Sequence, residues 1–246
     1  MAATIQNAGR LFRIAVASAD SITAGEHHGH QQAALVSLVF AVVSLEAFFN
    51  ESVGLANLCL ISGRAFVEGG GNPKSPEPQV VSTFHQLMTD AEDAHMQLES
   101  KFVLANWLLT GRAVDRSRQP FQDLAVLVKV RNQLVHFKPN EIFAGPEVTH
   151  EILTHSRNPA IKHLRGRNVL ADDIAGLTGW SEWISTKAMA KWSCDVVSRV
   201  IVDFIGKTPT AGQWGRMLRF WQSTFHLDVT AAVVKSPSPA EQRPDT

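Results

Sequence analysis

The sequence lacks several features that would place it in a protein class at once. It has only two cysteines, Cys59 and Cys194, too few for a disulfide framework. Both lie within apolar helical patterns, so we expect them to be reduced core residues of a cytoplasmic protein. Its 23 basic residues are balanced by 23 acidic ones, which argues against the strongly basic surface usual in nucleic-acid-binding proteins. A hydrophobic content of 45% excludes wholesale disorder.

Signals for export, membrane insertion and phosphate binding are also weak or absent. The apolar run over 14–19 is shorter than the core of a signal peptide. The run from Ala33 to Phe49 is slightly short for a membrane span and contains Glu46, so we expect a buried core helix and no membrane contact. Gly69–Gly71 lacks the lysine and the preceding strand of a phosphate-binding loop.

Histidine is the residue type that most suggests a metal site, but its spacing does not support one. The tract His27-His28-Gly29-His30 has no cysteine and no carboxylate except Glu26 at ligand spacing, so we expect a solvated loop. His95 lies on the apolar stripe of a predicted helix and is expected in the core. Three further histidines lack zinc-type spacing: His150, His155 and His163. We therefore predict no metal and no cofactor.

Helical periodicity dominates the chain and alternating strand patterns are scarce, which predicts an all-α fold. Four main helices are expected over about 31–61, 79–110, 120–137 and 181–205, with a short fifth over 214–225. Gly63 and Gly111 should end the first two helices, and Pro139 should end the third. The expected organisation is an N-terminal segment over 1–30, one helical domain over 31–227 with an irregular insertion over about 138–180, and a disordered tail over 228–246.

The first predicted helix is apolar on more than one face. Its main stripe includes Leu38, Leu45 and Phe49, while Phe40 and Val43 lie on other faces. A helix of this kind is either central to the fold or exposed on one side to a partner.

The third predicted helix carries a charge within its apolar stripe. At about 100° per residue, Arg131 falls among Leu124, Val128 and Val135. A guanidinium in such a stripe is costly unless it is paired. Glu46 lies within the apolar stripe of the first helix, which predicts an Arg131–Glu46 contact. Asn50, one turn after Glu46, should lie beside this pair and share its hydrogen bonds.

Arg131-Asn132 followed by His136 resembles the R-x4-6-H motif of the HEPN superfamily. Its surroundings are similar too and occur in the family's order over roughly residues 31–206. They are Ser44-Leu45-Glu46-Ala47-Phe48-Phe49-Asn50-Glu51, Lys101-Phe102, Leu109-Thr110-Gly111, Pro120-Phe121-Gln122-Asp123-Leu124 and Ala190-Lys191-Trp192.

The resemblance implies a HEPN-like bundle of four main helices that forms a homodimer. Many members are metal-independent endoribonucleases, among them toxins, phage-defence nucleases and RNA-processing factors. A toxin of this kind would have an antitoxin or another protein partner. Other members have lost catalysis and bind RNA, a nucleotide or a protein. The resemblance therefore implies a fold more firmly than an activity.

The side chains of the motif suit RNA cleavage without a metal. His136 can take the proton of a 2′-hydroxyl or protonate the leaving 5′-oxygen, because imidazole titrates near ~6.5. Arg131 can grip the phosphate and stabilise the charge that develops on it. Asn132 could orient His136 or contact a phosphate oxygen. The product would carry a 2′,3′-cyclic phosphate.

A structural interpretation of the same residues also stands. Arg131 and Glu46 could form a buried pair that fixes helix register, and His136 could be a core or capping histidine. In that case the chain would be a non-catalytic binding module.

The neutral total conceals an uneven distribution of charge. Residues 112–167 contain ten basic side chains and five acidic ones, a surplus of +5, whereas residues 77–99 contain five acidic side chains and no basic one. Four cations that follow the motif have no acid between them and are candidates for contact with an RNA backbone, although an exposed solvated loop explains them equally well. They are Arg157, Lys162, Arg165 and Arg167.

Overall fold

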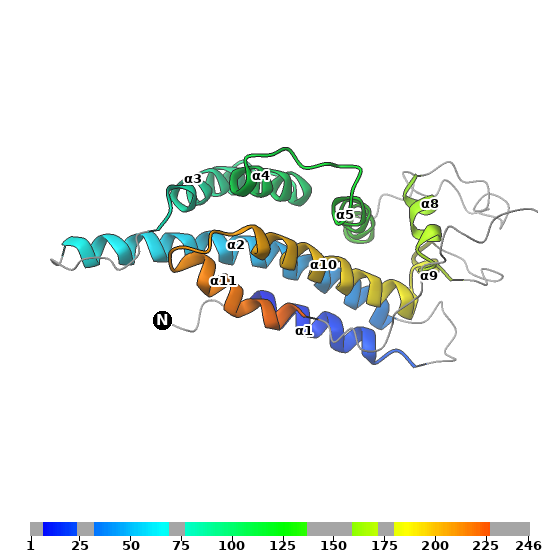
Figure 1. The fold of residues 1–246 in the computed structure, drawn as a ribbon. Helices are drawn as coiled ribbons and strands as arrows, with labels where there is room; N and C mark the ends of the chain where they lie inside the picture. Colours follow the sequence, from blue (N-terminus) through cyan, green and yellow to red (C-terminus); the bar gives the residue numbers. More distant parts are fainter. Residues whose placement is uncertain (1–6, 24–31, 69–76, 137–158, 172–179, 227–246) are drawn as a thin grey trace, which may run out of the picture.

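The computed structural model describes residues 7–23, 32–68, 77–136, 159–171 and 180–226. All the regular elements in these residues are helices, so the all-α prediction is confirmed (Figure 1). They are α1 (Asn7–Asp20), α2 (Gln32–Glu68), α3 (Gln79–Asp93), α4 (Leu98–Thr110), α5 (Phe121–His136), α8 (Pro159–Gly166), α9 (Trp180–Trp183), α10 (Lys187–Lys207), α11 (Trp214–Gln222) and the 3₁₀ turn η2 (Ser223–Phe225).

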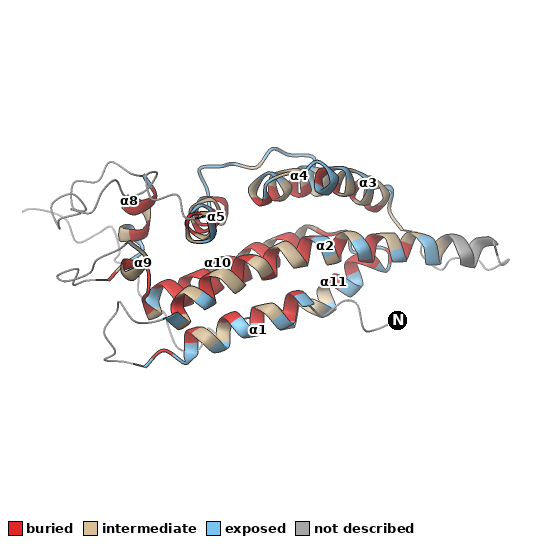
Figure 2. Ribbon diagram, turned by 180° about the vertical axis from the view of Figure 1, so that it is seen from behind, coloured by how far each residue is buried: buried red, intermediate tan, exposed pale blue. Residues whose placement is uncertain are grey.

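Helices α2 and α10 run side by side through the middle of the fold. Helices α1 and α11 lie on one side of them, and α3, α4 and α5 lie on the other, with α5 crosswise (Figure 1). Buried positions follow the inner faces of these helices and exposed positions face outward (Figure 2). The two central helices therefore provide the surface on which α1, α3, α4, α5 and α11 pack.

An aromatic cluster fills the core between α2, α3, α10 and α11. Phe204 of α10 packs edge to face against Phe48 and Phe49 of α2, with ring centroids 5.5 and 5.4 Å apart. Its ring also contacts Phe84 of α3 and Trp214 of α11. The Trp214 indole donates to the Ser52 carbonyl at 2.9 Å, so its one polar atom is satisfied.

The N-terminal segment contains a helix that periodicity did not predict, and this helix belongs to the core. Phe12 of α1 is buried against Phe225 at 5.4 Å between ring centroids. The Glu51 carboxylate of α2 accepts hydrogen bonds from the first two amides of α1, at Asn7 and Ala8. Gly9 permits close approach, because a Cβ there would lie 2.6 Å from Thr224. Residues 7–20 therefore pack within the domain expected to begin at residue 31.

Two predicted helix boundaries are wrong. α2 continues through Gly63 to Glu68, because a glycine without a positive φ does not end a helix. The helix predicted over 79–110 is two helices. The backbone of His95 has a φ of 52°, and the Met96 amide bonds the Ala91 carbonyl at 2.8 Å, which closes the end of α3. His95 is therefore exposed and is not a core residue.

The other helix predictions agree with the structure more closely. Gly111 ends α4 in a left-handed conformation with φ 65°, and α5 covers Phe121–His136. The segment predicted as one helix over 181–205 begins with the short α9. It starts again at α10, where the Thr186 side chain accepts from the Met189 amide. The tract His27-His28-Gly29-His30 and the tail 228–246 lie outside the described residues.

One helix in the described part of the chain is long and apolar enough to cross a membrane. It covers Gln32–Gly63 of α2, with a mean hydropathy of 2.0, and half of its most apolar window is buried inside the fold. The core helix of a protein that never enters a membrane also meets these criteria.

Candidate functional site

The site suggested by the sequence lies where α5 crosses α2. A guanidinium nitrogen of Arg131, on α5, contacts a carboxylate oxygen of Glu46, on α2. The expected Arg131–Glu46 contact is therefore present. The Arg131 side chain is 14% exposed and that of Glu46 is 40% exposed, so the pair lies at the edge of the core.

The position of this pair follows from the path of α5. Leu124 and Val128 occupy its apolar stripe and are buried against the bundle. Further along α5, the same face of the helix extends beyond α2. Arg131 is therefore half-buried, and Val135, one turn later, is 53% exposed. Burial lowers the pKa of the Arg131 guanidinium, which nevertheless stays charged. Its buried Nε has no hydrogen-bond partner.

The remaining residues of the predicted site are only partly brought together. Asn132 is half-buried next to Arg131. His136 is the last residue of α5, and its side chain lies outside the described atoms. Asn50 is exposed, and the described contacts include no hydrogen bond from its side chain to Glu46 or Arg131. The prediction that Asn50 shares hydrogen bonds with the pair is therefore wrong.

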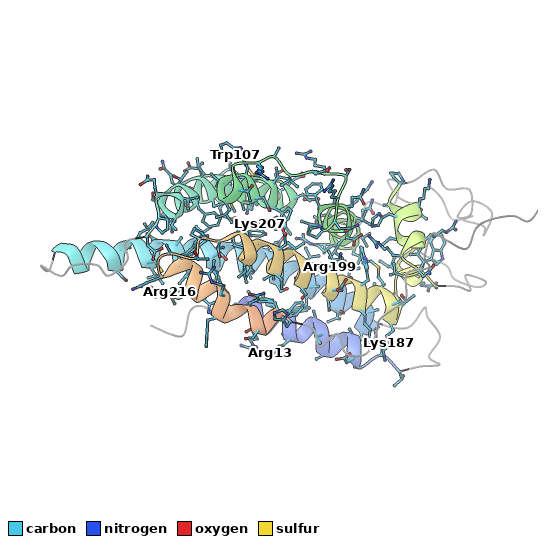
Figure 3. All side chains as sticks on the ribbon, in the orientation of Figure 1. Arg13, Trp107, Lys187, Arg199, Lys207 and Arg216 are labelled. Atoms are coloured by element: carbon cyan, nitrogen blue, oxygen red, sulfur yellow. The ribbon has the colours of Figure 1, made fainter. Side chains whose placement is uncertain are left out.

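A second polar cluster, which the sequence analysis missed, surrounds Asp123 in the first turn of α5. This carboxylate is completely buried and accepts hydrogen bonds from four side chains on three other segments. Oδ1 accepts from His163 Nε2 at 2.6 Å, from Gln119 at 3.1 Å and from Arg167 at 2.9 Å, and Oδ2 accepts from Arg199 at 3.0 Å. Arg199 lies on α10 beside α5 (Figure 3). We call this group the Asp123 cluster.

The charge of Asp123 is stabilised by its partners. Burial by itself would raise the pKa of this carboxyl, but hydrogen bonds from Arg199 and His163, together with the charges of Arg167 and Arg199, lower it below the ordinary value. The cluster joins α8 to α5 and α10. In the sequence, the cluster is marked only by one acidic residue on the third predicted helix. Its basic partners lie 40 to 76 residues further along the chain, so no local spacing connects them.

This lowered pKa predicts a stability contribution that is lost in acid. The contribution of Asp123 is complete above its unfolded-state pKa of ~3.9 and is lost as the pH falls through the lower folded-state pKa. We therefore expect the free energy of unfolding of the unmodified protein to fall more steeply below about pH 4 than that of Asp123→Asn. Urea unfolding at pH 5, 4 and 3 measures both slopes, and equal slopes would contradict the prediction.

The candidate RNA-binding cations have different environments. Lys162 is exposed and Arg165 half-buried on α8, whereas Arg167 turns inward to Asp123. Arg157 lies outside the described residues. Arg167 is therefore part of the Asp123 cluster although its side chain is 38% exposed, and the RNA-facing surface stays a prediction for Lys162, Arg165 and Arg167.

A cavity of about 430 Å³ lies between α4, the connection 111–120, α5 and α10. Its polar wall includes buried Asn106, whose oxygen accepts from Lys207 at 2.5 Å, while Lys207 also pairs with Asp203. Across it, Arg118 pairs with Asp115. These two ion pairs match four of the charges that line the cavity, and Arg112 lines it as well.

Neither cysteine has the environment of a nucleophile. Cys59 and Cys194 are buried and free, and burial raises the pKa of each thiol to about 11. In the described ranges, no group of three or more His, Cys, Asp or Glu side chains could hold a metal ion.

Comparisons with known proteins leave the chain without an assigned family. No family model, no curated protein and no solved structure matches it.

Proposed function

We propose that this chain is a metal-independent endoribonuclease of the HEPN type, with Arg131 and His136 as its catalytic residues. The observation that carries the proposal is the Arg131–Glu46 pair at the edge of the core. It holds a guanidinium two turns or less from the exposed end of α5, where Asn132 and His136 follow. An arginine and a histidine held at one helix end suit a phosphodiester substrate.

The proposed reaction is a transesterification within the RNA. As the 2′-oxygen attacks the adjacent phosphorus, His136 removes its proton and water protonates the leaving 5′-oxygen, or water takes the 2′-proton and protonated His136 gives its proton to the leaving oxygen. The bond from phosphorus to the 5′-oxygen breaks, giving a 2′,3′-cyclic phosphate and a 5′-hydroxyl. Arg131 donates to the phosphate oxygens and stabilises their added charge. Glu46 acts as a positioning residue, because its carboxylate fixes the guanidinium.

RNA cleavage in the presence of EDTA tests the proposal. We expect the unmodified protein to cut a mixed RNA substrate, and we expect His136→Ala to reduce the rate at least about 100-fold, which is typical for loss of a general acid or base. RNA with 2′-deoxy nucleotides at the cleavage site should be resistant. The products should carry a cyclic phosphate, which mass spectrometry detects.

His226→Ala is the matched control, because His226 is an exposed histidine in the last described segment. It should cleave at the unmodified rate, and circular dichroism should show both variants folded. Absence of cleavage across varied RNAs, or full activity in folded His136→Ala, would contradict the proposal.

A non-catalytic RNA- or protein-binding module is the second candidate. It is favoured by the low exposure of Arg131, whose charge Glu46 already neutralises. Retardation of RNA on a native gel without cleavage would support this alternative.

A further inference from the structure

We propose that the cavity between α4, the connection 111–120, α5 and α10 binds a small carboxylate with an apolar body. Its volume of about 430 Å³ lies within the range of pockets that hold one small organic molecule. The proposal does not depend on ribonuclease activity. The cavity lies at Phe121, where α5 begins, whereas Arg131 of the pair with Glu46 is about 15 Å further along the same helix.

The charges around the cavity leave a surplus of one cation. Three basic side chains line it, Arg112, Arg118 and Lys207, against two acidic ones, Asp115 and Asp203. Lys207 pairs with Asp203, and Arg118 pairs with Asp115. The described hydrogen bonds of Arg112 involve only its backbone. Within the described part of the chain, its guanidinium is therefore the unmatched charge of the cavity, and it suits one negatively charged group.

The buried wall of the cavity has hydrogen-bond donors to spare. Asn106 is only 2% exposed; its oxygen accepts from Lys207, and one of its two amide hydrogens goes to the Phe102 carbonyl at 2.8 Å. The described contacts use two of the three hydrogens of the Lys207 ammonium, on Asn106 and Asp203. One hydrogen on each nitrogen is therefore left over, and these donors call for a ligand with acceptor oxygens.

Apolar side chains complete the lining of the cavity. Phe102 is 1% exposed and Phe121 is 9% exposed, and their ring centroids are 6.2 Å apart. Val114 and Pro120 of the connection also line the cavity. Apolar walls with a few polar groups are typical of a site for a small organic molecule, so the carboxylate should be carried on an apolar or aromatic body.

The charge of the cavity favours a carboxylate over a phosphate ester. A carboxylate carries one negative charge at pH 7, which equals the surplus left by Arg112. A phosphate monoester carries about −1.5 to −2 charges at pH 7, which exceeds that surplus. A carboxylate can also accept two parallel hydrogen bonds from one guanidinium.

Titration with phenylacetate, followed by ligand-observed NMR, tests the site. Phenylacetate carries one carboxylate on an aromatic body, and for so small a ligand we expect a dissociation constant in the millimolar range. Phenylacetamide has nearly the same shape but no charge. It should bind at least about 10-fold more weakly, because hydrogen bonds to charged groups are stronger than those to neutral groups.

Substitution of Arg112 identifies the group that holds the carboxylate. Arg112→Ala should raise the dissociation constant for phenylacetate at least about 10-fold, and Arg112→Lys should recover part of the affinity, since the charge is kept but the paired hydrogen bonds are lost. Arg112 is exposed, so both variants should fold. Arg13→Ala is the matched control, because Arg13 is an exposed arginine of α1, on the other side of the central helices (Figure 3). Its affinity should be unchanged.

Two measurements show whether the ligand enters the cavity or rests on the exposed arginine. Asn106→Leu removes a donor from the buried wall at similar volume and should raise the dissociation constant at least about 5-fold, with folding checked by circular dichroism. In the unmodified protein, nuclear Overhauser effects should connect the phenylacetate ring to the Phe121 ring, which tests the same point without a substitution.

Four results would overturn the proposal. The first is no binding of phenylacetate at millimolar concentrations, and the second is equal affinity for phenylacetamide. The third is unchanged affinity in folded Arg112→Ala, and the fourth is absence of any Overhauser effect from the bound ligand to Phe121. Tighter binding of phenyl phosphate than of phenylacetate would also contradict it and assign the cavity to phosphate esters.

Discussion

Replacing Phe204 with alanine is expected to lower the free energy of unfolding by about 4 kcal/mol, because a fully buried aromatic ring is removed and the core closes only partly around the space. Phe204 contacts rings on three other helices, including Phe84 and Trp214. These helices cannot all move inward to fill the cavity, so the expected loss of unfolding free energy lies well within the range measured for such truncations. Urea denaturation followed by circular dichroism gives the value.

Phe220→Ala is the control for this experiment. Phe220 is 82% exposed on α11, so its removal should change the stability by less than about 0.5 kcal/mol. A loss below about 2 kcal/mol for Phe204→Ala would show that the aromatic cluster is loosely packed, contrary to the close ring contacts.

Asp123→Ala should be nearly as disruptive, with an expected loss of about 3 kcal/mol. The substitution removes the only carboxylate shown to join Arg167, just after α8, to Arg199 of α10. Breaking a buried ion pair commonly costs ~3–5 kcal/mol, and we take the lower end because both arginines are more than a third exposed and can be solvated. Urea denaturation at pH 7 measures the loss.

Asp195→Ala provides a control on the same arginine. Asp195 also pairs with Arg199, at 2.9 Å, but its side chain is 47% exposed. An exposed pair one helical turn apart is worth only about 0.3–0.5 kcal/mol, so this variant should be close to the unmodified protein. Equal losses in the two variants would show that burial of Asp123 does not set the strength of the cluster.

The Asp123 cluster also changes how the basic residues after the motif are interpreted. Sequence alone placed Arg167 among cations available to RNA, whereas the structure gives it a buried carboxylate partner. His163, which has no zinc-type spacing, is likewise a partner of Asp123. Part of the local positive surplus therefore stabilises the fold, and Lys162 remains the exposed cation on α8.

The sequence by itself determined the helical class, several helix ends and one tertiary contact. Apolar residues at helical spacing require burial on one side, and Gly111 ends a helix because its left-handed conformation suits glycine. The Arg131–Glu46 contact was predictable because each charge interrupts an apolar stripe, and a charge buried in a core is costly unless it is paired with an opposite charge.

Only the tertiary structure decided which side chains meet when no local pattern marks them. The buried residues of α1 follow helical spacing, but apart from Phe12 they are alanine or glycine, which give a weak apolar signal, and its first amides are held by Glu51 of α2. The partners of Asp123 come from α8 and α10, and chain spacing does not determine which helix faces Asp123. Likewise, the sequence left open whether the first predicted helix is central to the fold or exposed on one side. In the structure this helix, α2, packs at the centre on one side and is exposed on the other. Local rules act over about one helical turn, whereas these contacts depend on how whole helices pack.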